Sequence, residues 1–254
     1  MGQQKGWIDG WYPVILDRTL LHRIPEFVEH RNGQFCVALN FELSFIAEVC
    51  AHGYMPMGEI VRGRPILLIK SHQRRSVLNF ENLHISRKLK RYARTLTFHI
   101  NRDFSECLQQ TVAYHHPDTW LIKPLRDALI SLHKESMFGV RFHSIEIYDG
   151  DNLVAGEIGY TTGAIYSSLS GFHTQNGSGS VQLVVLGKIL QESGFMFWDL
   201  GMDLSYKKTL GAQLMARNAF LDYWQDNCDR PTPLWSTLRL ETDGLLQKLK
   251  HTTN

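Results

Sequence analysis

Apolar residues recur along the chain with two different periods, and these periods predict a mixture of helices and short strands. Apolar positions at helical spacing predict helices at residues 40–52, 86–94, 103–113, 124–133 and 181–191. Short apolar or alternating runs predict strands at residues 65–70, 76–80, 97–100, 144–148, 153–159, 164–168 and 219–221. Residues 1–34 show no sustained period and predict an irregular lead-in, and residues 53–58 predict a turn. Helices combined with mostly antiparallel strands indicate an α+β fold.

One further apolar run, at residues 195–198, stops at Asp199 and is followed by Leu200 and Gly201. This pattern predicts a buried strand whose C-terminal end carries a single ionisable group. In open α/β sheets, ligands bind in the crevice beyond such strand ends. Because a buried carboxylate needs a partner, Asp199 either caps the following turn or takes part in chemistry.

A glycine- and serine-rich loop at residues 176–180 precedes the predicted helix at 181–191. Glycines ahead of a helix expose N–H groups that can bind an anion. The alternative is a flexible linker in which Ser180 is the helix N-cap. The sequence leaves both interpretations open.

The composition is that of an ordinary globular protein. The 254 residues are 43% hydrophobic and 20% charged, and no apolar run has the roughly 20 residues that a membrane span needs. The N-terminal residues contain no apolar stretch of the kind a secretory signal requires, and the four cysteines form no CxxC pair. His115 and His116 are adjacent and so do not share a face, which favours a surface loop over a metal site. We therefore expect a soluble cytoplasmic protein with reduced thiols and no bound metal.

The positive charge is concentrated in one stretch of the chain. The net charge is only +2, but residues 62–94 contain ten cations and one acid, Glu81. The cations are Arg62, Arg64, Lys70, Arg74, Arg75, Arg87, Lys88, Lys90, Arg91 and Arg94. Such a run is usually a solvated helix face, but a cluster of this size is also suited to binding phosphates.

Several segments of the chain resemble bacterial leucyl/phenylalanyl-tRNA–protein transferases. The matches run in the same order over roughly residues 53–222, and the most specific are the LHISR segment at 83–87 and the spacing from Asp199 to Leu210-Gly211-Ala212. The supporting matches are RPIL at 64–67, RSVL at 75–78, Thr119-Trp120, Leu132-His133, SIE at 144–146, LVAG at 153–156, Gly159, Gly163, Ser170 and Phe172.

The resemblance implies a small N-terminal domain, residues 1–73, and a C-terminal domain, residues 74–254, with an acetyltransferase-like (GNAT-type) mixed sheet and flanking helices. It implies transfer of Leu or Phe from aminoacyl-tRNA to the α-amine of a protein that begins with Lys or Arg, which marks that protein for degradation. It implies no cofactor and no membrane, and we expect a monomer.

The resemblance also implies roles for particular residues. Asp199 would be the catalytic group that binds and orients the attacking amine. The aminoacyl pocket would be formed by Tyr166, Leu169, Ser170, Phe172, Leu186 and Leu190. The tRNA would be held by Arg74, Arg75, Arg87, Lys90 and Arg91, with Trp120 stacking on the terminal base.

The chain departs from the family pattern at sites that matter for this chemistry. Gly201 stands where the family has the Gln of Asp-Cys-Gln, and Leu169 and Gly171 replace the Glu and Met of Glu-Ser-Met-Phe. Met57 replaces the Trp of Phe-Pro-Trp. Two alternatives therefore stay open: an acyl-CoA-dependent N-acetyltransferase of the same fold, and a catalytically inactive module that binds tRNA or protein N-termini.

Overall fold

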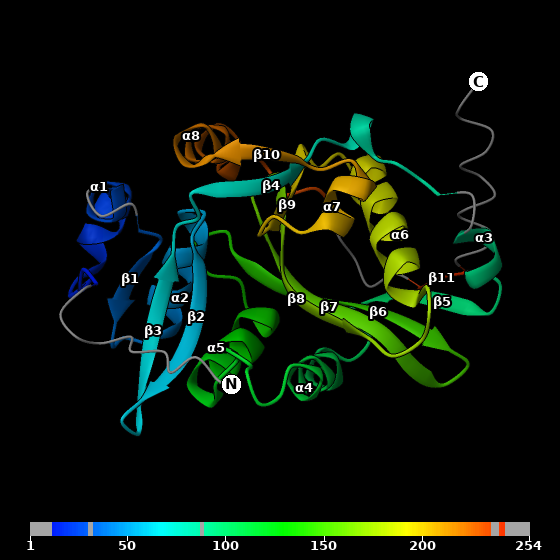
Figure 1. The fold of residues 1–254 in the computed structure, drawn as a ribbon, viewed down its shortest axis with the longest axis horizontal. Helices are drawn as coiled ribbons and strands as arrows, with labels where there is room; N and C mark the ends of the chain where they lie inside the picture. The colour runs from blue at the N-terminus through cyan, green and yellow to red at the C-terminus, as the bar shows by residue number, and fades with distance from the viewer. Residues whose placement is uncertain (1–11, 30–32, 87–88, 235–238, 242–254) are drawn as a thin grey trace.

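Two β-sheets flanked by helices make up the fold (Figure 1). The computed structural model describes residues 12–29, 33–86, 89–234 and 239–241 of the chain. In that described part, no helix has both the length and the apolar character needed to cross a membrane.

The smaller sheet lies at one end of the molecule (Figure 1) and is antiparallel in the order β1-β3-β2. Its strands are β1 (Phe35–Ala38), β2 (Met55–Val61) and β3 (Arg64–Lys70). It is accompanied by the 3-10 helix η1 (Arg18–Arg23) and the helices α1 (Ile24–Glu29) and α2 (Leu43–Ala51). The turn predicted at 53–58 is therefore wrong, because Met55–Val61 pairs with β3 along its whole length. The irregular lead-in is also wrong for residues 18–29.

The larger sheet has the order β10-β4-β9-β8-β7-β6-β5-β11. Its strands are β4 (Arg74–Leu78), β5 (Leu96–Ile100), β6 (Arg141–Asp149), β7 (Asn152–Thr162), β8 (Ile165–His173), β9 (Phe197–Gly201), β10 (Gln213–Ala216) and β11 (Arg239–Glu241). All neighbouring strands are antiparallel except β8 and β9, which are parallel and are joined through α6. The predicted α+β class with a mixed, mostly antiparallel sheet is confirmed.

Helices pack on both faces of the larger sheet. Helices α4 (Phe104–Tyr114) and α5 (Lys123–Lys134) cover one face of β6 and β7, and α6 (Ser178–Ser193) covers the other (Figure 1). The remaining helices are η2 (Phe80–Asn82), α3 (Leu89–Tyr92), α7 (Ser205–Leu210) and α8 (Arg217–Cys228). The strand predicted at 219–221 is wrong, because Phe220, Trp224 and Asn227 are buried at the spacing of a helix.

The two faces of the larger sheet have separate hydrophobic cores. The core on the α4 and α5 side also takes in side chains of the smaller sheet and α2, such as Leu67 and Phe45, together with Trp224 of α8. The indole N–H of Trp224 donates to the Ala51 carbonyl over 2.7 Å, which ties α8 to α2. The strands divide between the sheets at the predicted 73/74 boundary, but this shared core joins both parts, so the two-domain division stays a prediction.

Candidate active site

A cavity of about 750 Å³ lies where strands β8 and β9 separate. The two strands are paired through Ile165–Phe197, Tyr166–Trp198 and Ser167–Asp199, and the pairing ends there. We call this last pair, Ser167 and Asp199, the β8–β9 fork. Immediately beyond it, Ser168 and Leu169 from β8 and Leu200 from β9 line the cavity.

Three of the six residues predicted for the aminoacyl pocket line this cavity. Leu169, Ser170 and Phe172 do so, and a β-bulge at Leu169 gives β8 one extra residue opposite β7. Tyr166, Leu186 and Leu190 are fully buried in the core beneath α6 and are not among the lining residues. The structure thus divides the predicted pocket into a lining group and a supporting group.

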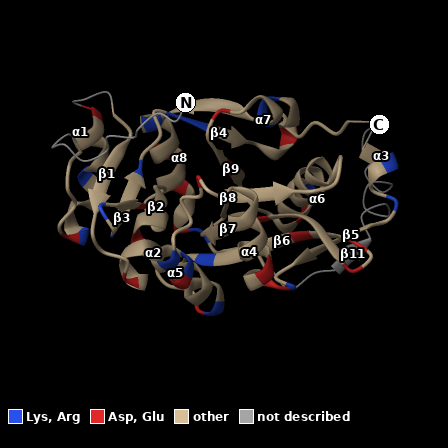
Figure 2. Cartoon of the chain, turned by 60° about the horizontal axis from the view of Figure 1, so that its bottom comes forward, with Lys and Arg blue, Asp and Glu red and all other residues tan. Residues whose placement is uncertain are grey.

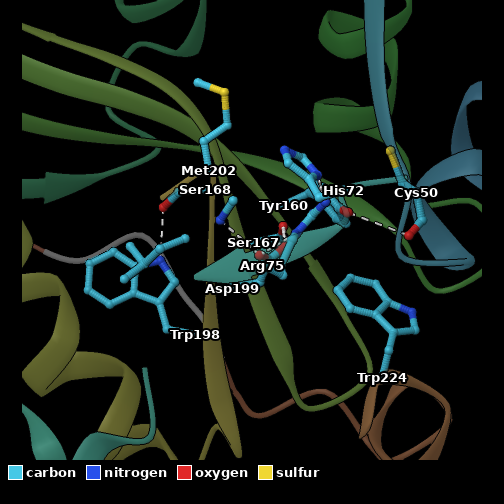
Figure 3. A network of polar contacts seen from close by, with 12 residues as sticks. Cys50, His72, Arg75, Tyr160, Ser167, Ser168, Trp198, Asp199, Met202 and Trp224 are labelled. Atoms are coloured by element: carbon cyan, nitrogen blue, oxygen red, sulfur yellow. Dashed lines mark hydrogen bonds and ion pairs between the residues drawn. The ribbon is translucent and has the colours of Figure 1, made fainter. Parts of the chain in front are cut away.

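Asp199 lies inside β9 and not after its end, and it is fully buried. Arg75 of β4 donates two hydrogen bonds to its carboxylate, from Nε to Oδ1 (2.7 Å) and from Nη2 to Oδ2 (2.6 Å). The Ser167 hydroxyl donates to Oδ2, and the Gly201 N–H donates to Oδ1 over 2.9 Å (Figure 3). Although burial opposes the charge of Arg75, the Asp199 carboxylate beside it raises the pKa of its guanidinium. Asp199 therefore ties β4, β8 and β9 together at the fork.

The Asp199 side chain is on the opposite face of β9 from the cavity. Successive side chains of a strand alternate between faces. Leu200 lines the cavity, whereas Asp199 does not and packs with Arg75, whose guanidinium lies 4.9 Å from the Phe220 ring centre. Figure 3 shows Trp198 and Ser168 on one side of β9 and the Arg75–Asp199 pair on the other. In this arrangement the Asp199 carboxylate does not line the cavity, and its role as the catalytic group stays a prediction.

The predicted tRNA-binding residues occupy different environments. Arg74 and Arg91 are exposed, and blue segments appear on β4 and α3 in Figure 2. Arg91 donates to the Tyr92 hydroxyl over 2.6 Å, and Tyr92 lines the cavity. Arg75 is 2% exposed and its charge faces Asp199, so it does not present a cation to a phosphate. Arg87 lies outside the described residues, as does the side chain of Lys90.

Trp120 is partly buried and packs against the core shared by the two sheets. Its carbonyl accepts the Gly58 N–H over 2.9 Å, so its backbone contacts β2. It is not among the residues that line the cavity. Its predicted stacking on a terminal base stays a prediction.

The N-terminal end of α6 faces the cavity. Its N-cap is Gly177, with φ 84°, so Ser180, the N-cap in the linker alternative, lies inside the helix. A Cβ at residue 177 would come within 2.7 Å of the Tyr92 ring, so glycine is required there for space as well as for its φ. Gly177, Gly179 and Ser180 line the cavity.

Two ionisable residues of the cavity wall were missed by the sequence reasoning. Glu157 of β7 is 5% exposed, and its Oε1 accepts from the Tyr166 hydroxyl (2.9 Å) and the Ser168 hydroxyl (2.8 Å). Burial raises the pKa of Glu157 to about 7, although hydrogen bonds from Ser168, Tyr166 and Gln182 oppose this shift. The available signal was one acid in a strand whose neighbours are all apolar or glycine, VAGEIGY at 154–160.

The second is Lys207 of α7, which is 7% exposed. Its ammonium group donates to the carbonyls of Leu200 and Met202 and so holds the backbone that follows the fork. Burial lowers the pKa of Lys207 to about 8, and the carboxylates of Asp199 and Glu157 oppose this shift. Both missed residues line the cavity.

Comparison with known proteins agrees with the resemblance seen in the sequence. The family model "Leucyl/phenylalanyl-tRNA protein transferase" matches residues 77–225. A transferase of that name from Pseudomonas paraeruginosa is 34% identical over 202 residues, which cover 78% of this chain and 86% of the relative. One from Pseudomonas aeruginosa PAO1 is 32% identical over 208 residues, covering 80% and 89%.

Two solved structures also align over much of the chain at low similarity. FemX aligns with a TM-score of 0.43 and 10% identity, covering 79% of this chain and 74% of FemX. A GCN5-related N-acetyltransferase from Anabaena variabilis aligns with a TM-score of 0.38 and 14% identity, covering 78% and 47%. The match of the family model to more than half of the chain, with relatives above 30% identity, decides the family: the chain belongs to the leucyl/phenylalanyl-tRNA protein transferases, which are acyltransferases.

Proposed function

We propose that this chain transfers an amino acid of largely apolar side chain, Leu, Phe or one of similar size, from aminoacyl-tRNA to the N-terminal α-amine of a protein. The observation that carries the proposal is the cavity at the β8–β9 fork, inside the segment that the family model matches. Its volume of about 750 Å³ is typical of a small-molecule site. Leu169, Phe172 and Leu183 give it apolar walls that suit an amino-acid side chain.

The reaction is the aminolysis of an ester. The nitrogen of the acceptor amine bonds to the carbonyl carbon, the ester bond breaks, and the terminal ribose hydroxyl of the tRNA leaves with the proton that the amine gives up. Aligning a neutral amine with the carbonyl supplies a large part of the rate. No covalent intermediate on the enzyme is required.

We assign Asp199 a positioning role in this reaction. Its four hydrogen bonds fix β4, β8 and β9 where the cavity begins, and its full burial separates it from substrate. Direct binding of the attacking amine by Asp199, as the family resemblance implies, would require Arg75 to release the carboxylate. Gly201, which stands in place of the family Gln, has φ 74° and supplies its backbone N–H to Asp199.

Exposed cations supply the proposed tRNA contacts. The exposure of Arg74 and Arg91 supports this assignment for these two predicted contacts. Acceptors beginning with Lys or Arg, a role in protein degradation, a cytoplasmic location and a monomeric state belong to the same proposal and rest on the family resemblance.

A second candidate is acyl-CoA-dependent N-acetylation. The observation in its favour is that the N-terminal turn of α6 faces the cavity, since such a turn can bind a pyrophosphate. Acetyl-CoA binding together with acetylation of a peptide amine would support it.

The test uses purified protein, tRNA charged with radiolabelled Leu, Phe or another amino acid of similar size, and a peptide that begins with Arg. Transfer of label to the peptide supports the proposal, and a peptide with an acetylated N-terminus is the matched control because it lacks the attacking amine. tRNA binding without transfer of any amino acid would refute the enzymatic proposal and favour a binding module.

A further inference from the structure

The cavity wall carries a polar patch formed by three adjacent side chains, Glu157, Ser168 and Gln182. Glu157 is its centre, because the Ser168 hydroxyl and the Gln182 side chain both donate to its carboxylate. The Tyr166 hydroxyl donates from behind the wall. The rest of the lining includes hydrocarbon side chains, among them Leu169, Phe172, Leu183, Leu200 and Leu210.

The Glu157 carboxylate retains capacity for a further donor. A carboxylate has about four lone-pair positions, and three donors are assigned to this one. It forms no ion pair with any residue in the described part of the chain. The nearby cation Lys207 directs its ammonium group to the carbonyls of Leu200 and Met202.

The strand opposite has a glycine beside this acid. Gly171 faces Glu157 in the β7–β8 register, and a Cβ at 171 would lie 2.7 Å from the Gly156 carbonyl oxygen and 2.9 Å from the Glu157 Cβ. Where the family pattern places Met, this chain therefore has no side chain beside Glu157. This chain has Leu169 where the family pattern has Glu, and its own Glu157 stands on the neighbouring strand, β7.

We propose that Glu157 makes this pocket selective for an amino acid whose side chain has an apolar stem and a hydrogen-bond donor at its tip, in preference to the hydrocarbon side chains of Leu and Phe. This inference rests on the proposed function. A hydrocarbon tip placed against the carboxylate removes its remaining water and returns no hydrogen bond, whereas a donor tip replaces that water. Apolar walls alone discriminate weakly, but a polar group built into a pocket discriminates strongly.

The experiment measures binding apart from transfer. The probes are adenosines that carry an amino acid through a 3′-amide, which cannot be transferred, in two matched pairs: phenylalanine with tyrosine, and norleucine with lysine. At about pH 8, where Glu157 is ionised, we expect the donor member of at least one pair to bind the native protein about tenfold more tightly or better, which is the size expected of one hydrogen bond to a charged group. In Glu157→Met, the ratio of the donor probe's affinity to the hydrocarbon probe's affinity should fall to one or below.

Two further variants keep the result interpretable. Glu192→Gln removes an exposed acid from the far end of α6 and should leave both ratios unchanged. If Glu157→Met does not fold, Glu157→Gln keeps the size and loses the charge, and should bring the lysine ratio toward one. The inference is overturned if the hydrocarbon probes bind the native protein as tightly as the matched donor probes. It is also overturned if the Glu157 variants leave the affinity ratios of the two pairs unchanged.

Transfer to the Arg-peptide is assayed in parallel with tRNA charged with Leu, Phe, Tyr or Lys, so the two proposals can fail separately. Transfer of Leu together with tighter binding of the hydrocarbon probes overturns the selectivity and leaves the proposed function. Tighter binding of a donor probe without any transfer supports the selectivity and overturns the proposed function. Failure of every probe to bind overturns the selectivity, and failure of all four charged tRNAs to transfer their amino acid overturns the proposed function.

Discussion

Replacing Glu157 by Gln should change how the stability of the protein depends on pH. In the folded protein burial raises the pKa of Glu157 from its ordinary value of 4.5 to about 7. Between these two values the folded chain holds a proton that the unfolded chain has released. The stabilisation is therefore fully present below the unfolded pKa and is lost as the pH rises through the folded pKa. Gln at this position does not titrate.

The size of the effect follows from the shift. One pKa unit corresponds to about 1.4 kcal/mol, so a shift from 4.5 to about 7 amounts to about 3 kcal/mol. The charged group that faces Glu157 is Lys207 on α7, and its polar partners come from β8 and α6. These remain in the variant, so the difference in unfolding free energy, native minus Glu157→Gln, should fall by about 3 kcal/mol from about pH 4 to about pH 8.

The assay is urea unfolding of both proteins across this pH range. Other buried groups also titrate: burial raises the pKa of Glu146 and lowers that of His143 to about 3. They are present in both proteins, so their contributions cancel in the difference. A difference that stays level with pH would refute the reasoning and show that the Glu157 carboxyl ionises in the cavity as it does in water.

Three other predictions concern the fork, a turn and the surface. Asp199→Ala should lower the unfolding free energy, measured by chemical denaturation, by about 3–5 kcal/mol, because it leaves Arg75 buried without its partner. The double variant Asp199→Ala with Arg75→Met should lose less unfolding free energy than the sum of the losses in the two single variants. Gly211→Ala should destabilise the protein in thermal melts, since Gly211 has φ 109° and a Cβ would collide with the Asn82 carbonyl. Arg74→Ala should reduce the slope of log tRNA affinity against log salt concentration by roughly one, because one phosphate contact is lost. A slope equal to that of the native protein would show that Arg74 does not contact the tRNA.

Much of the fold was predictable wherever one period dominated a segment. The helices at Phe104–Tyr114 and Lys123–Lys134 and the hairpin of β6 and β7 were found within a few residues of their ends. The failures have physical causes. Met55–Val61 contains Pro56 and Gly58, which signal a turn, yet Gly58 is needed because a Cβ there would lie 2.9 Å from the Trp120 carbonyl oxygen. In this segment the packing against Trp120 and the pairing with β3 outweigh the local preference for a turn.

The site was harder to predict than the fold because it depends on which face of a strand each side chain occupies. The position of Asp199 next to a strand end was nearly right, but a shift of one residue along a strand exchanges the two faces. With Asp199 inside β9, its carboxylate turns toward Arg75, and Leu200 turns toward the cavity. Sequence spacing alone could not show which of the two side chains faces the cavity, because that depends on where the pairing of β8 with β9 ends.

The same alternation explains why the acid of the cavity is Glu157. Tyr166 and Trp198 are paired across β8 and β9 and belong to the core beneath α6, so the next residue of each strand, Ser167 and Asp199, faces away from α6. Glu157 stands on the α6 face, as does Ala155 two residues before it in β7, and it accepts a hydrogen bond from Tyr166 there. We therefore propose separate tasks for the two carboxylates: Asp199 holds the strands at the fork, and Glu157, which lines the cavity, contacts the bound amino acid. A change that abolishes transfer through Asp199 should therefore leave the relative affinities of the matched probes as they are, while a change at Glu157 should alter those affinities and leave the fork intact.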